Sequence, residues 1–234
     1  MLLYYITDRK SFDGTVAEQW SAVLRRISEA ARAGVDYIQL REKDLSPREL
    51  ERLARGALSA VRDHSATARL LINGRADIAM ACGADGVHLP GGEITASEVR
   101  TLWMKCSVRQ PLIGVSAHSA EEVRHAHAHG ADFAVLAPIF GKVQTGQKGI
   151  GLALLRECCA HPVAPANTEQ PILERFAVLA LGAVTPSNAR ACLEAGASGV
   201  AGIRLFQTGD LKETVRRLRE LAARLPIERV QSLS

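Results

Sequence analysis

A short motif recurs four times along the chain, and this repeat constrains the possible fold more than any other feature. Glycine is the preferred residue at the left-handed position that ends many helices. Each copy therefore predicts a helix that ends directly before a strand. The copies start 49, 47 and 66 residues apart, which leaves room for two strand–helix units in each interval, so the motif is expected before every second strand. The copies are Gly34-Val35-Asp36-Tyr37, Gly83-Ala84-Asp85-Gly86, Gly130-Ala131-Asp132-Phe133 and Gly196-Ala197-Ser198-Gly199.

Eight apolar, β-prone segments alternate with segments of helical spacing or helix-start pattern. Strands joined through helices are parallel, and eight such units predict a (β/α)₈ TIM barrel. We expect residues 1–234 to form a single barrel domain, with a loop insertion near 161–175 because the last interval is longer. The predicted strands lie in Leu2–Asp8, Tyr37–Lys43, Leu70–Asn73, Gly86–Leu89, Leu112–Ser116, Phe133–Ile139, Phe176–Leu181 and Gly199–Ile203. Helices are predicted in Thr15–Ala33, from Ser46, in Ala76–Cys82, from Thr95, from Ser119, in Leu152–Cys159, from Thr185 and in Leu211–Leu225.

The composition fits one sizeable domain that binds small anions. Barrel domains often reach the length of this chain, 234 residues, as one unit. The formal charge of +4 is too weak and too scattered to predict a nucleic-acid partner. Neither a signal-peptide pattern nor an apolar run of roughly 18 residues is present, so no membrane partner is expected. The five cysteines are odd in number and contain no CxxC pair, which favours a reducing, cytoplasmic location.

The segment Tyr37–Lys43 carries the first candidate binding residues. Side chains alternate along a strand, so Gln39, Arg41 and Lys43 share one face. Two cations and an amide at a buried strand end are costly unless an anion meets them, and phosphate is the usual ligand of such a set. The alternative is a strand end in solvent, whose charges pair with Glu42 or Asp44.

A barrel of this type carries its active site at the carboxyl ends of the strands. We therefore expect the residues that end each strand to form one ring. Backbone N–H groups near Gly182 and Gly202-Ile203, with a short helix from about Arg204, predict a second phosphate site. Two separate anion sites fit two phosphorylated substrates. The other ring candidates are Gln39, Arg41, Lys43, Asn73, Arg75, His88, Glu93, Ser116, His118, Lys142 and Lys148.

Seven segments, in order along nearly the whole chain, resemble the thiamine phosphate synthase/TenI family. Each is weak alone, but the series is specific. The segments are Tyr5-Ile6-Thr7-Asp8, Gln39-Leu40-Arg41-Glu42-Lys43, Ile72-Asn73-Gly74-Arg75, Gly83-Ala84-Asp85-Gly86-Val87-His88-Leu89, Ile113-Gly114-Val115-Ser116-Ala117-His118-Ser119, Ala137-Pro138-Ile139-Phe140 and Ala195-Gly196-Ala197-Ser198-Gly199-Val200-Ala201.

This resemblance implies a transferase of thiamine biosynthesis. It would join hydroxymethylpyrimidine diphosphate to thiazole phosphate and release pyrophosphate, with Mg²⁺ on the diphosphate. By position, Gln39, Arg41, Lys43 and Asn73 would hold the diphosphate, and Ser116 would lie beside the pyrimidine. The thiazole phosphate would bind at Gly182 and at the turn that follows Ala201 and contains Gly202 and Ile203. The resemblance also suggests that the protein forms a homodimer. The spacing of the motifs does not test this.

The chain departs from the synthase pattern at the expected metal site and in one loop. Gly74 replaces one metal carboxylate, which leaves Glu93 as the candidate Mg²⁺ ligand. The threonine- and lysine-containing loop after the sixth strand is replaced, and Lys142 and Lys148 are the candidates to supply its cation.

Two alternatives to the synthase stay open. The first is a TenI-like thiazole phosphate tautomerase, with His118 or His88 as its acid/base group because Pro138 occupies the place of the usual histidine. The second is a non-catalytic barrel that binds phosphorylated ligands.

Overall fold

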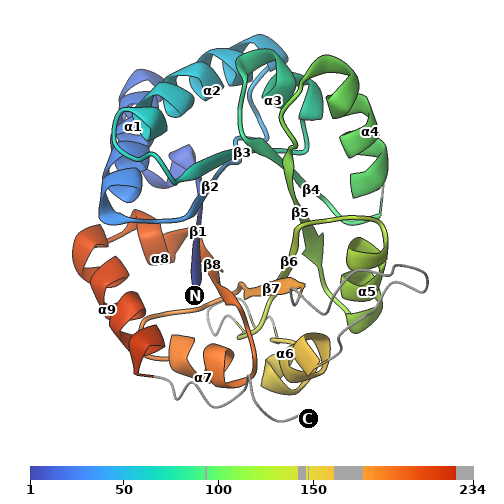
Figure 1. The fold of residues 1–234 in the computed structure, drawn as a ribbon. Helices are drawn as coiled ribbons and strands as arrows, with labels where there is room; N and C mark the ends of the chain where they lie inside the picture. Colours follow the sequence, from blue (N-terminus) through green and yellow to red (C-terminus); the bar gives the residue numbers. More distant parts are fainter. Residues whose placement is uncertain (93, 142–145, 147, 161–175, 225–234) are drawn as a thin grey trace.

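The computed structural model describes residues 1–92, 94–141, 146, 148–160 and 176–224. Eight parallel strands close into a barrel in chain order, and the helices surround it (Figure 1). The predicted (β/α)₈ architecture is thus confirmed. The strands are β1 Leu2–Ile6, β2 Tyr37–Leu40, β3 Arg69–Asn73, β4 Gly86–Leu89, β5 Leu112–Ala117, β6 Phe133–Leu136, β7 Ala177–Ala180 and β8 Gly199–Gly202. The helices are η1 Arg9–Ser11, α1 Val16–Ala33, α2 Pro47–Arg62, α3 Ala76–Cys82, α4 Ala96–Cys106, α5 Ala120–Ala128, α6 Gly151–Ala160, α7 Ala189–Glu194, α8 Arg204–Gln207 and α9 Leu211–Ala223.

The repeated glycines stand where the sequence places them, before the even-numbered strands β2, β4, β6 and β8. Gly34 and Gly83 cap α1 and α3 in the left-handed conformation, with φ of 89° and 71°. Gly130 and Gly196 follow α5 and α7 with φ of 79° and 101°. The motif therefore ends a helix and turns the chain directly into the sheet, as its glycine predicts.

The aspartate of the same motif has a second structural role, at the amino-terminal end of the barrel. In three copies its carboxylate accepts a hydrogen bond from a backbone N–H of the preceding odd-numbered strand. This contact ties each even strand to its neighbour and helps to fix their register. The pairs are Leu3 N to Asp36 Oδ2 at 2.7 Å, Leu70 N to Asp85 Oδ2 at 2.8 Å and Ile113 N to Asp132 Oδ2 at 2.6 Å.

The interior of the barrel is filled by side chains. Tyr4, Leu71, Phe133 and Leu179 belong to an apolar cluster contributed by the inward faces of the strands. A Cβ atom on Gly114 would lie 2.3 Å from Phe133 Cζ, so β5 needs glycine where the phenyl ring crosses the interior. The interior is therefore a packed core that closes the amino-terminal side of the pocket described below.

The capping residues predicted at three helix starts are confirmed, with one informative difference in their side-chain contacts. Ser46 and Thr95 form complete capping boxes with Glu49 and Glu98. Ser119 caps α5 through the N–H of Glu122, but the Glu122 carboxylate accepts from the N–H of His118 at 2.7 Å instead of completing the box. The reason is that His118 lies in the turn after β5, where its N–H has no strand partner.

Other predicted boundaries differ by a few residues. The strand expected in Phe133–Ile139 ends at Leu136, because Pro138 has no N–H for a sheet ladder. The helix expected from Thr185 begins at Ala189, after a turn in which Asn188 Oδ1 accepts from the N–H of Thr185.

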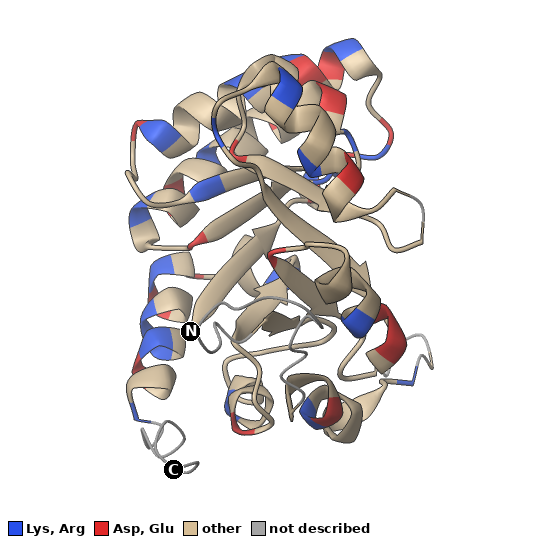
Figure 2. Cartoon of the chain, turned by 45° about the vertical axis from the view of Figure 1, so that its right-hand side comes forward, with Lys and Arg blue, Asp and Glu red and all other residues tan. Residues whose placement is uncertain are grey.

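Charged residues lie mainly on the outer helices and the loops, whereas the strands are almost free of them (Figure 2). Among the helices of the described segments, none is both long and apolar enough to span a membrane.

Candidate active site

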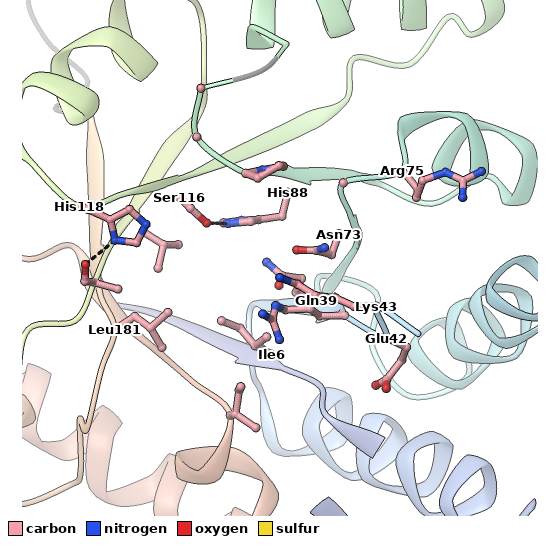
Figure 3. Close-up of a pocket in the computed structure, with 18 of the residues that line it drawn as sticks. Ile6, Gln39, Glu42, Lys43, Asn73, Arg75, His88, Ser116, His118 and Leu181 are labelled. Carbon is pink, nitrogen blue, oxygen red and sulfur yellow. Dashed lines mark hydrogen bonds between the residues drawn. The ribbon is translucent and has the colours of Figure 1, made fainter. Parts of the chain in front are cut away.

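A pocket of about 970 Å³ opens at the carboxyl ends of the strands (Figure 3). Every strand, or the residue or two that follow it, contributes to its lining, so residues from all eight strand ends meet in one cavity, as predicted. In chain order the contributors are Ile6, Gln39, Asn73, His88, Ser116, Ala137, Leu181 and Ile203.

The end of β2 brings three predicted residues to this pocket. Gln39 is 1% exposed, Arg41 is half-buried and Lys43 is exposed, and all three line the cavity. Among the described residues, no hydrogen bond or ion pair involves the side chain of Arg41 or Lys43. These two cations therefore stand ready for an anionic ligand.

The neighbouring carboxylates do not neutralise these cations, contrary to the alternative drawn from the sequence. Glu42 and Asp44 bind Arg9 instead, at 3.0 Å and 2.6 Å. Arg9 and Glu42 have side chains that are 5% and 2% exposed, so their pair is buried behind β2. Burial raises the pKa of Glu42, and the hydrogen bonds from Thr7 and Arg9 oppose that shift.

Thr7 connects this buried pair to the pocket. Its hydroxyl donates to Glu42 Oε1 at 2.7 Å and accepts from the backbone N–H of Arg41 at 3.0 Å. The turn that presents Arg41 is therefore held from behind by a buried network. Sequence reasoning missed Arg9 and Thr7, which lie 33 and 35 positions before Glu42 in the chain.

Neutral polar groups form the β1–β5 wall of the pocket. Gln39 Nε2 donates to the hydroxyl of Tyr4 at 2.9 Å, and that hydroxyl lies 3.1 Å from His88 Nδ1. His88 Nε2 lies 2.9 Å from Ser116 Oγ (Figure 3). Burial, with a smaller contribution from the positive charge of Arg41, lowers the pKa of His88 to about 3. His88 is therefore a neutral, fully hydrogen-bonded histidine, and Tyr4 is a member of the wall that the sequence did not reveal.

His118 occupies the rim of the pocket. Its side chain is exposed, and Nδ1 lies 2.7 Å from the carbonyl oxygen of Ala137 (Figure 3). A carbonyl only accepts, so Nδ1 carries a proton and donates it to this contact. Glu122, also missed from the sequence, lines the pocket, and its carboxylate accepts from the backbone N–H of His118.

The β7–β8 side presents apolar side chains and backbone donors. Leu181 and Ile203 line the pocket, and Gly182 and Gly202 stand next to them in the chain without lining it themselves. In the part of the chain that the structure describes, the N–H groups of Gly182, Ala183 and Ile203 donate no hydrogen bond. Gly182 has φ of 106°, and a Cβ atom there would lie 2.6 Å from Pro138 Cα, so only glycine fits.

Besides these two glycines, three predicted site residues are not placed in the pocket. Lys148 is exposed and does not line it. Lys142 and Glu93 lie outside the described residues, as does the insertion predicted at 161–175. Asn73, in contrast, lines the pocket from the end of β3, as expected.

The described residues do not fit a Mg²⁺ site. Glu42 directs both carboxylate oxygens at Thr7 and Arg9, and Glu122 Oε2 accepts from the N–H of His118. Within the described ranges, no three or more His, Cys, Asp or Glu residues gather closely enough to hold a metal ion. The carboxylates of the described pocket are thus committed to protein donors.

Known proteins are similar to this chain in sequence and in fold. The profile of the thiamine monophosphate synthase family matches residues 3–206. A thiamine-phosphate synthase of Moorella thermoacetica is 34% identical over 86% of this chain and 89% of its own length. One from Syntrophomonas wolfei is 31% identical over 94% of this chain and 95% of its own length.

The solved structure of thiamine phosphate pyrophosphorylase from Pyrococcus furiosus superimposes with a TM-score of 0.72. Its sequence is 26% identical, and the match covers 95% of each chain. A 3-hexulose-6-phosphate synthase, at 18% identity and a TM-score of 0.64, shares the barrel fold alone. The profile match and the two synthases together assign the chain to a family: it belongs to the thiamine monophosphate synthase family.

Proposed function

We propose that the protein is a thiamine phosphate synthase, a transferase that couples hydroxymethylpyrimidine diphosphate to thiazole phosphate and releases pyrophosphate. One observation carries this proposal: among the described residues, cations without a partner and backbone N–H groups without a partner stand on two different sides of the pocket, with a neutral wall between them. Unpaired cations stand at the end of β2, and backbone donors stand after β7 and β8. A pocket with this division suits two phosphorylated substrates bound face to face.

The β2 side is proposed to hold the diphosphate. Arg41 and Lys43 supply positive charge, and Gln39 and Asn73 supply neutral donors. Ser116 is proposed to lie beside the pyrimidine ring, since β5 presents it to the pocket next to His88. Positive charge at the diphosphate is most useful where the bond to pyrophosphate breaks, because negative charge grows there in the transition state.

The β7–β8 side is proposed to hold the thiazole phosphate. The N–H groups of Gly182, Ala183 and Ile203 donate to no other described residue and are the candidate ligands. Leu181 and Ile203 would cover the thiazole ring with apolar surface. Backbone donors do not titrate, so the charge of the donors at this site would not change with pH.

The coupling needs electrostatic help more than proton transfer. The bond from the pyrimidine methylene carbon to the diphosphate oxygen breaks, and its electron pair leaves with pyrophosphate. The thiazole nitrogen then donates its lone pair to that carbon, forming the carbon–nitrogen bond. This nitrogen carries no proton to remove, so the wall around His88 can stay neutral throughout. Arg41 and Lys43 would stabilise the departing pyrophosphate.

We also propose that Mg²⁺ binds together with the diphosphate. Glu93 is the carboxylate proposed to contact it, together with oxygens of the diphosphate. No catalytic step is assigned to the metal, because the described carboxylates do not fit it.

The direct test incubates the protein with both substrates and Mg²⁺ and follows thiamine phosphate and pyrophosphate together. We expect equal amounts of both products, loss of turnover with a chelator, and near-complete loss in Arg41→Ala. Arg25→Ala, which removes an exposed arginine from α1, is the matched control and should retain full activity. Binding of both substrates without product would instead indicate a non-catalytic barrel. Metal-free proton exchange on the thiazole would indicate a tautomerase, with His118 as the acid/base group.

A further inference from the structure

Four side chains from four different strands form one hydrogen-bonded chain through the barrel interior. It runs from Gln39 on β2 to Tyr4 on β1, then to His88 on β4 and Ser116 on β5, with contacts of 2.9, 3.1 and 2.9 Å. Tyr4 is 0% exposed and His88 is 3% exposed, so water does not compete for their polar atoms. Gln39, His88 and Ser116 all line the pocket, and Ser116, beside the proposed pyrimidine position, is the only one of these three that is not fully buried.

The chemistry of the first members fixes the direction of this chain. An amide nitrogen only donates, so the oxygen of Tyr4 accepts from Gln39 Nε2. Among the described residues, His88 Nδ1 is the only other hydrogen-bond partner of the Tyr4 hydroxyl, so the phenol proton is directed at that nitrogen, which then accepts. A neutral imidazole that accepts at Nδ1 carries its proton at Nε2.

This direction reaches the pocket at Ser116. The proton on His88 Nε2 points at Ser116 Oγ, so that oxygen accepts. The serine's own proton is therefore left to donate elsewhere, and the pocket is the open side. Burial raises the pKa of the Tyr4 phenol and lowers that of His88, so neither group changes its charge near neutral pH.

We propose that Tyr4 and His88 are positioning residues that fix the Ser116 hydroxyl as a hydrogen-bond donor toward an acceptor atom of the bound ring. The inference rests on the proposed function, in which that acceptor is a ring nitrogen of the pyrimidine. Without this series of hydrogen bonds, the serine hydroxyl could rotate and present either its proton or its lone pairs. With the series in place, the site selects rings that offer an acceptor opposite the Ser116 hydroxyl.

The first test needs no turnover. Nitrogen-15 NMR of labelled histidines reports which ring nitrogen of His88 carries the proton, with His88→Gln identifying the resonances by their loss. We expect the proton on Nε2 in the free protein, and a shift of the Nδ1 resonance in Tyr4→Phe. A proton on Nδ1 would reverse the chain and overturn the proposal. This result stands whether or not the protein releases pyrophosphate, so it separates the inference from the proposed function.

The second test asks whether Tyr4 acts through Ser116. Tyr4→Phe keeps the ring and removes the hydroxyl, and should raise the KM for the pyrimidine diphosphate about tenfold with little change for thiazole phosphate. The same change made in a Ser116→Ala background should have no further effect on that KM. Equal effects in both backgrounds, or equal effects on both substrates, would show a merely structural role and contradict the proposal.

Tyr5→Phe is the matched control. Tyr5 is also 0% exposed, and its hydroxyl makes one hydrogen bond, to Gln207 Oε1 at 3.1 Å, away from Ser116. The Tyr5→Phe variant should lose stability as Tyr4→Phe does and keep the wild-type KM for both substrates.

His88→Gln retains an amide donor near Ser116 and should keep more of the pyrimidine affinity than His88→Leu. The opposite order would also overturn the proposal.

Discussion

The two sides of the pocket present different chemical groups to an anion: side chains on one side and backbone N–H groups on the other. The β1–β5 side is built from side chains that hold one another in place, from the buried Arg9–Glu42 pair to the chain that ends at Ser116. The β6–β8 side has few such contacts and presents backbone N–H groups between apolar side chains. Side chains give charge and hydrogen bonds of fixed direction, whereas backbone donors give shape without charge.

This difference predicts which kind of mutation disturbs each side of the pocket. On the β1–β5 side, one lost partner leaves a buried polar or charged group unpaired, so mutations there should affect folding as well as binding. On the β6–β8 side, no single side chain supplies the donors. Only a change of backbone conformation should disturb that side.

The largest expected effect comes from breaking the buried ion pair behind β2. Arg9→Met keeps the length of the side chain but leaves Glu42 buried without its cation. The free energy of unfolding in urea should fall by about 3–5 kcal/mol. Lys10→Ala, which removes a 61% exposed partner of Asp44, is the control and should cost about 1 kcal/mol or less. Equal losses in the two variants would contradict the role given to the buried pair.

The same variant makes a prediction about pH. Burial already raises the pKa of Glu42 in the native protein, and loss of Arg9 should raise it further. A carboxyl with a raised native pKa binds more protons folded than unfolded, so its destabilising effect shrinks as the pH falls through that pKa. The stability deficit of Arg9→Met relative to wild type should therefore be smaller at about pH 5 than at about pH 8. Denaturation series at both pH values check this, and an equal deficit would contradict it.

A backbone change should disturb the opposite side. Gly182→Ala places a Cβ atom against Pro138 at a φ of 106°, which is strained by about 1–3 kcal/mol. The KM for thiazole phosphate should rise more than the KM for the pyrimidine diphosphate. Gly209→Ala is the matched control, because Gly209 also has a positive φ, 65°, but no atom lies within 4 Å of its Cβ position. An equal effect of the two changes would show that local strain alone is responsible.

The smallest expected effects sharpen the assignment of the cations. Lys43→Ala should raise the KM for the pyrimidine diphosphate about tenfold, since Lys43 lines the pocket. Lys148→Ala should change it less than about twofold, because Lys148 is exposed and outside the lining. Initial rates at varied diphosphate concentration measure both. A larger effect of Lys148 would show that its loop reaches the substrate.

The sequence predicted the fold well because the fold depends on local, periodic signals. The glycine at each helix end and the apolar run after it are short-range features, and all four copies of the motif lie where the sequence placed them. The candidate residues Gln39, Asn73 and Ser116 line the pocket as predicted, because the carboxyl ends of all strands in a parallel barrel lie on the same face.

What the sequence did not reveal are the long-range partners. Arg9 reaches Glu42 across 33 positions, and Tyr4 reaches His88 across 84, so no local pattern marks either pair. Whether Glu42 neutralises Arg41 or binds another cation is decided only when β1 and β2 lie side by side. The carboxylate of Glu122 is a similar case, since its capping pattern was recognised but not its contact with His118.

Separate binding of the two substrates is the central claim, and calorimetric titration of each alone tests it most directly. Arg41→Ala should weaken binding of the pyrimidine diphosphate by about tenfold or more and leave thiazole phosphate unchanged. Gly182→Ala should do the reverse. This reciprocal result is the one that the two-sided pocket predicts. Parallel losses for both ligands in both variants would mean that a single shared anion site exists, and would contradict the account.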